Sequence, residues 1–118
     1  MDQEQSLDAL HLLLQGMVEK DRAKLERSMT RDARLYHISG LAESREDYVR
    51  DILDGTLNYY DYRIKEIQGD VVRVRLLAKV YGGVARWWNL AMEVQYAEED
   101  DFIKIKESKV KLDIRHHP

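Results

Sequence analysis

The first half of the chain contains the stretch Asp32-Ala33-Arg34-Leu35-Tyr36-His37-Ile38-Ser39-Gly40. Residues 34–38 form a short alternating pattern, which indicates a β-strand with one buried face. Helical periodicity precedes and follows this strand, so the chain begins with helices interrupted by a short strand. The histidine at position 37 stands where a pocket could form beside the strand.

Two helices are expected before this strand. Residues 6–20 carry apolar side chains at helical spacing, which predicts one amphipathic helix. Its apolar positions are Leu7, Leu10, Leu13, Leu14, Met17 and Val18. Asp21 can cap a second, shorter helix by accepting from unpaired backbone amides. The buried side of that helix is predicted to contain Ala23, Leu25 and Met29.

A third helix is expected after the strand. Ser44-Arg45-Glu46-Asp47 has the form of a capping box with Asp in its fourth place, and helical periodicity continues from there to Gly55. Beyond Gly55 the period changes from 3.6 to 2, which predicts strands.

The second half of the chain is predicted to form four long strands. Turn signals occur at Gln68-Gly69-Asp70, at Gly82-Gly83 and at the charged run 98–101. The last strand is expected over Phe102–Leu112. Two sets of alternating side chains are assigned to one interior face: Val72, Val74, Leu76, Ala78 and Val80, and then Trp88, Leu90, Met92, Val94 and Tyr96.

Composition limits the class of protein. With 118 residues, 44% hydrophobic and 35% charged, the chain suits a single domain over residues 1–118. A net charge of -3 with interspersed signs argues against a nucleic-acid partner. There are no cysteines, and neither a targeting segment nor an apolar run of about eighteen residues is found, so we expect a cytoplasmic protein without membrane contact.

The order of elements predicts an α+β fold, a cone-shaped roll with three N-terminal helices packed on a curved antiparallel β-sheet. Several segments in this order and spacing resemble the nuclear transport factor 2-like superfamily of the SnoaL-like type, over essentially the whole chain. These segments are Lys20-Asp21, residues 32–40, Ser44-Arg45-Glu46-Asp47-Tyr48, Gly55-Thr56-Leu57-Asn58-Tyr59-Tyr60, and Val80-Tyr81-Gly82-Gly83 before Trp88.

The resemblance implies a pocket between the concave sheet and the helices, and a homodimer formed through the outer sheet face. It does not imply one activity, because the superfamily includes ketosteroid isomerases, scytalone dehydratase, polyketide cyclases and epoxide hydrolases as well as binding proteins. His37 falls where steroid-isomerase-like members place a catalytic carboxylate. It is therefore a candidate general base, and the alternative is a half-buried strand residue bonded to a backbone carbonyl or a tyrosine.

An oxyanion donor of the isomerase type is missing, since the corresponding first-helix position is near Leu13 and is aliphatic. Tyr48, Tyr60, Tyr62 and Tyr81 are possible substitutes, although tyrosines in strands more often serve packing. Trp88 could stack on a ligand or fill the core. The predicted ligand-binding residues are Leu14, Tyr36, His37, Ser39, Tyr48, Tyr62, Trp88 and Met92.

No metal site or cofactor is predicted, because His11, His37 and the terminal pair His116-His117 lack ligand spacing. The outer face is expected to carry a dimer interface, with a solvated sheet as the alternative. Its expected residues are Arg73, Arg75, Leu77 and Trp87.

Three functional hypotheses follow. The favoured one is a protein that binds a small, largely apolar or aromatic molecule. The alternative is a small lyase, isomerase or cyclase that uses His37. The third is a homodimeric interaction module whose cone is filled by Leu13, Leu14, Met17 and Met92.

Overall fold

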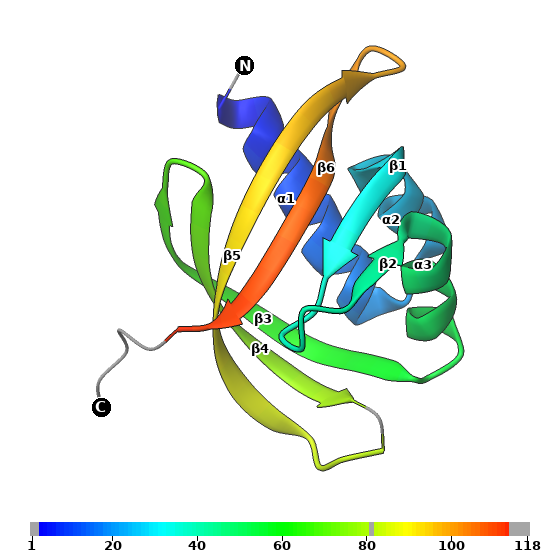
Figure 1. Cartoon of the computed structure of the whole chain (residues 1–118), viewed down its shortest axis with the longest axis vertical. Coiled ribbons are helices and arrows are strands. Elements are labelled where there is room, and N and C mark those ends of the chain that lie inside the picture. The colour runs from blue at the N-terminus through cyan, green and yellow to red at the C-terminus, as the bar shows by residue number, and fades with distance from the viewer. Residues whose placement is uncertain (1–2, 81, 114–118) are drawn as a thin grey trace.

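A computed structural model describes residues 3–80 and 82–113. Three helices lie against one curved sheet of six strands (Figure 1). The elements in chain order are α1 (Gln3–Glu19), α2 (Arg22–Ser28), β1 (Met29–Tyr36), β2 (Ala42–Ser44), α3 (Arg45–Leu53), β3 (Leu57–Gln68), β4 (Val71–Val80), β5 (Arg86–Glu99) and β6 (Phe102–Leu112). The predicted α+β cone is confirmed.

The sheet is mixed, which corrects the prediction of a wholly antiparallel sheet. Its strand order is β2-β1-β6-β5-β4-β3, and β1 pairs with β6 in parallel, while every other pairing is antiparallel. The four long strands follow one another through hairpins, which set antiparallel directions. No hairpin joins β1 to β6, so the local sequence carries no signal for their relative direction.

The first helix begins at Gln3, three residues before its predicted start, whereas the predicted starts of the second and third helices are confirmed by their caps. The Asp21 carboxylate accepts from the backbone N–H of Lys24 at 3.1 Å, and the Ser44 hydroxyl accepts from the backbone N–H of Asp47 at 3.1 Å. Each bond satisfies a first-turn amide that has no partner within its helix. The sequence pattern places Met29 on the second helix, but Met29 is the first residue of β1 and is fully buried.

The short strand ends before the histidine. β1 runs from Met29 to Tyr36, and His37 begins a turn in which its N–H donates to the Leu41 carbonyl at 2.9 Å. This turn leads into β2, a strand of three residues that the sequence did not indicate. The expected strand over 34–38 is therefore displaced toward the N-terminus, and His37 stands at its end.

The concave face of the sheet packs on the helices and forms the core. The predicted interior positions of β4 and β5 are buried, except that Val80, Trp88 and Tyr96 are only partly buried. α1 packs against α2 and, on the sheet, against β3 and β6, while α3 packs mainly against β1. The largest fully buried helical side chains are Leu10, Leu13, Leu14, Leu25 and Ile52.

A β-bulge changes which tyrosines of β3 face inward. The register with β4 shifts between Tyr59 and Asp61, so Tyr60 is an extra residue without a cross-strand partner. The bulge puts Tyr59 in phase with Tyr62 on the core side and leaves Tyr60 exposed. The alternation of polar and aromatic residues over 60–65 in the sequence predicts that Tyr60 and Tyr62 share one face, and the bulge makes this prediction wrong.

Candidate functional site

A cavity of about 370 Å³ lies between the helices and the concave face of the sheet. This volume is within the range of small-molecule sites. Aliphatic or thioether side chains make most of its wall: Leu13, Met17, Leu35, Ile38, Leu57, Leu76, Ala78, Val80, Leu90, Met92 and Val110. The polar or aromatic lining residues are Tyr36, His37, Ser39, Tyr48, Tyr59, Trp88 and Ser108.

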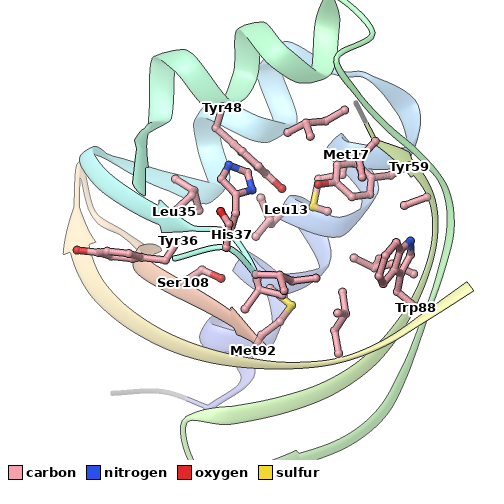
Figure 2. Close-up of a pocket in the computed structure, with 18 residues that line it drawn as sticks. Leu13, Met17, Leu35, Tyr36, His37, Tyr48, Tyr59, Trp88, Met92 and Ser108 are labelled. Carbon is pink, nitrogen blue, oxygen red and sulfur yellow. The ribbon is translucent and has the colours of Figure 1, made fainter. Parts of the chain in front are cut away.

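Six of the eight predicted ligand-binding residues line this cavity: Tyr36, His37, Ser39, Tyr48, Trp88 and Met92. In Figure 2, His37 and Trp88 lie on opposite sides of the space, and the Tyr36 ring points away from its centre. Their role in binding stays a prediction.

Leu14 and Tyr62 do not line the cavity, which corrects their expected placement. Successive residues of a helix point about 100° apart around its axis. Leu13 therefore faces the cavity, whereas its neighbour Leu14 points into the core and is fully buried. Tyr62 lies farther along β3, where α1 covers the sheet, and its hydroxyl is 3.3 Å from Nδ1 of His11. Tyr60 does not line the cavity either, and Tyr81 lies outside the described residues.

Sequence reasoning missed Tyr59 and Ser108 as lining residues. The Tyr59 side chain faces the cavity because of the bulge at Tyr60. Ser108 is 2% exposed, although β6 carries lysines before and after it. A small polar residue at an inward position of a lysine-rich strand was the available signal for Ser108.

His37 is paired with a carboxyl group that the sequence analysis did not single out. Nε2 of His37 makes a short contact with Oε1 of Glu43 on β2. In the β1–β2 register, Leu35 stands opposite Glu43, so His37 and Glu43 are diagonal neighbours on one face. Both side chains are largely buried, at 16% and 11% exposure.

A second carboxyl group lies behind Glu43. Burial raises the pKa of Glu43 above its ordinary value, a side-chain hydrogen bond with Asp51 of α3 raises it further, and His37 opposes the shift. Asp51 also pairs with the Arg50 guanidinium at 3.1 Å. The three side chains therefore form a chain from the cavity to the surface of α3, with His37 as its inner member.

The aromatic residues of the site have defined neighbours. The Tyr48 and His37 ring centroids are 5.8 Å apart, and the planes are tilted by 47°. The Arg86 guanidinium lies over the Trp88 ring, 3.7 Å from its centroid. The hydroxyl of Ser39 accepts from the backbone N–H of Leu41 at 3.3 Å, so it helps to form the β1–β2 turn.

The arrangement can enclose an apolar body and can present one basic nitrogen to it. When Glu43 is ionised it accepts from Nε2–H of His37, which leaves Nδ1 as the proton-accepting nitrogen of the neutral ring. Figure 2 shows one ring nitrogen of His37 directed toward the interior. Tyr48 and Tyr59 bring hydroxyl groups to the same cavity.

The described residues hold neither a metal-binding cluster nor a helix that could cross a membrane. Residues 3–80 and 82–113 contain no group of three side chains suited to hold a metal ion, and the pair His116-His117 lies outside them. In the same part of the chain, no helix has the length and apolar character needed to cross a membrane.

The chain has the nuclear transport factor 2-like fold, as its sequence suggested. It is similar to an NTF2-like protein from Cytophaga hutchinsonii, with 21% identity, a TM-score of 0.69, and coverage of 95% of this chain and 99% of that one. It is also similar to ActVI-ORFA from Streptomyces coelicolor, with 13% identity, a TM-score of 0.71, and coverage of 93% and 96%.

A third similar structure is an enzyme by name. A hexachlorocyclohexane dehydrochlorinase, LinA type 2, shares 16% identity at a TM-score of 0.65, with 91% of this chain and 82% of that chain covered. No protein-family model and no curated protein matches the sequence. At these identities the similarity establishes the fold, and the site has to supply the function.

Proposed function

We propose that the protein binds a small, largely apolar or aromatic molecule in the cavity of the cone. The observation that carries this proposal is the apolar space of about 370 Å³ between Leu13, Met17 and Met92. The hypothesis of a filled cone requires these side chains to occupy that space. Flat rings on opposite sides, Tyr48 and Trp88, favour an aromatic body between them.

The test uses the two tryptophans. Trp87→Phe leaves Trp88 as the single indole reporter, because the chain contains 2 tryptophans. A neutral aromatic contact quencher, bromobenzene, does not absorb at the wavelengths where tryptophan emits, and it is expected to quench Trp88 emission in this variant with a saturating dependence on concentration. In the matched variant, Trp88→Phe, Trp87 emission should stay unchanged by the probe. Equal quenching in both variants, or no quenching in either, contradicts the proposal.

A second candidate is a lyase, isomerase or cyclase with His37 as general base. The contact between Nε2 of His37 and Glu43 supports it, because such a pair fixes the orientation of the ring and leaves the other ring nitrogen to accept a proton. The named dehydrochlorinase has the same fold, which makes an elimination one reaction to consider. In a screen of activated C–H substrates that bind, His37→Gln should lower turnover about 10²–10⁴-fold with little change in affinity. Unchanged turnover would contradict a catalytic role for His37 and would leave binding as the proposed function.

A homodimer through the outer sheet face is the proposed assembly. Trp87 lies there between two guanidinium groups, with Arg75 at 4.9 Å and Arg63 at 5.6 Å from its ring centroid. Aromatic and arginine side chains are enriched at protein interfaces, and this composition of the outer face supports the proposal. Sedimentation equilibrium should give twice the monomer mass, and a monomer at every concentration contradicts the proposal.

A further inference from the structure

We propose that the molecule bound in the cavity carries an anionic group, a carboxylate or a sulfonate, which Arg86 holds at the rim. This inference rests on the proposed binding function and adds the chemical class of the ligand. It concerns a residue outside the lining of the cavity.

The position of Arg86 follows from the pairing of β5. Arg86 and Trp88 are two residues apart on one strand, so their side chains lie on the same face of the sheet. Trp88 lines the cavity, and so does Ala78, which is the cross-strand partner of Arg86. Arg86 itself is exposed and does not line the space. It therefore stands at the edge where the cavity meets solvent.

The guanidinium is held by stacking. Its central carbon lies 3.7 Å from the centroid of the Trp88 ring, which is close for a cation on an aromatic face. A stacked guanidinium uses its flat face, and the N–H groups at its edge stay available for hydrogen bonds. The cation is thereby oriented next to the apolar space without occupying it.

In the part of the chain that the structure describes, no carboxylate forms an ion pair with this cation. Within residues 3–80 and 82–113, Arg86 has no ion pair, whereas Arg31, Arg50 and Arg73 each have one or more. Glu43 contacts the lining residue His37, which lies on the opposite side of the cavity from Trp88, and is therefore already bonded. The charge at the Arg86 rim is thus positive, and a ligand with an apolar body and one anionic end would match both parts of the site.

The test compares two probes that differ by one charged group. 8-Anilinonaphthalene-1-sulfonate is anionic, and N-phenyl-1-naphthylamine is its neutral analogue; both fluoresce more strongly in apolar surroundings. Wild type, Arg86→Gln and Arg63→Gln are titrated with each probe after circular dichroism has established that all are folded. Arg63→Gln is the matched control, because Arg63 also lies over a tryptophan, Trp87, but on the outer face.

In wild type the sulfonate should bind about three- to tenfold more tightly than the neutral probe, as expected for one partly exposed charge-assisted contact. Arg86→Gln should remove this preference and leave neutral binding unchanged, and Arg63→Gln should change neither. Equal affinities in wild type, or a loss shared by both probes in Arg86→Gln, overturn the anion inference while binding stands. If neither probe binds, the binding function fails, and the inference fails with it.

Discussion

Trp87 and Trp88 are adjacent in the chain and lie on opposite faces of the same strand. Each ring is covered by arginine, Trp87 by Arg63 and Arg75, and Trp88 by Arg86. The surroundings beyond these contacts differ. Trp88 borders an apolar cavity, whereas Trp87 lies among charged side chains of an otherwise uncovered sheet.

The difference shows that the two faces of one sheet can have separate roles, because successive side chains of a strand point to opposite faces. On β4 the buried side chains of Val74 and Leu76 point into the cone. Arg73 and Arg75, which alternate with them, point outward. The inner face must exclude water to form the core and the cavity. The outer face has no such requirement, so it can carry charge and is the proposed place for a second copy of the chain.

The largest expected effect is a difference in the free energy of unfolding between substitutions on the inner and the outer face. Val74→Asp places a carboxylate at a position that is 1% exposed, between Ile64 and Leu90 on the neighbouring strands. An uncompensated buried charge should lower the free energy of unfolding by about 3–5 kcal/mol. Lys79→Asp, on the exposed side of the same strand, should change it by less than about 0.5 kcal/mol. Urea denaturation measures both, and similar losses would show that the faces are not distinct.

A smaller effect is expected on assembly. Trp87→Ala removes the aromatic centre of the proposed interface and should raise the dimer dissociation constant about thirtyfold, the scale of an interface hot spot. Trp88→Phe should leave that constant unchanged, because its ring is on the other face. Sedimentation velocity over a concentration series gives both values. A dimer that depends on Trp88 and not on Trp87 would reverse the proposed roles.

The third effect concerns the cavity. Trp88→Ala should weaken binding of N-phenyl-1-naphthylamine about tenfold, through the loss of ring contact with the probe. Trp87→Ala should leave this affinity within about twofold, since it does not line the space. Probe fluorescence measures the change, with circular dichroism to confirm folding. Equal losses in the two variants would mean that the probe is not bound on the inner face.

Much of the fold could be predicted because its signals are local. The caps at Asp21 and Ser44 and the change of period after Gly55 mark helices and strands by chemistry within a few residues. The parallel pairing of β1 with β6 has no such signal, since the partners are far apart in the chain. The bulge at Tyr60 also escaped prediction, because the run of polar and aromatic residues over 58–63 fits either phase of a strand.

The site was predictable only in part, because some of its contacts join segments that are far apart in the chain and leave no local signal. Alternation placed Trp88 and Met92 on the inner face, and the position of His37 in the pattern that resembles the family placed it near the cavity. Its partner Glu43 lies on a strand of three residues, too short to show a period. The carboxyl group behind it, Asp51, comes from a helix, and only the folded arrangement brings the three side chains together.

The smallest expected effect tests this buried group by pH. Because the pKa of Glu43 is raised, the folded protein binds that proton more tightly than the unfolded chain, whose carboxyl titrates near 4.5. Protonation of Glu43 therefore stabilises the fold, and this contribution is lost as the pH rises from 4.5 through the folded-state pKa. Glu43→Gln, which cannot ionise, should lose less stability than wild type over this interval.

Urea denaturation at a series of pH values between about 4 and 7 measures the difference. Glu93→Gln controls for the removal of one negative charge, because Glu93 lies on the outer face and pairs with Lys111. A free energy of unfolding of Glu43→Gln that falls with pH as steeply as that of wild type, or more steeply, would contradict this prediction. That result would mean that Glu43 does not bind a proton more tightly in the folded state than in the unfolded chain. The inner face would then differ from the outer one in packing and not in its titration.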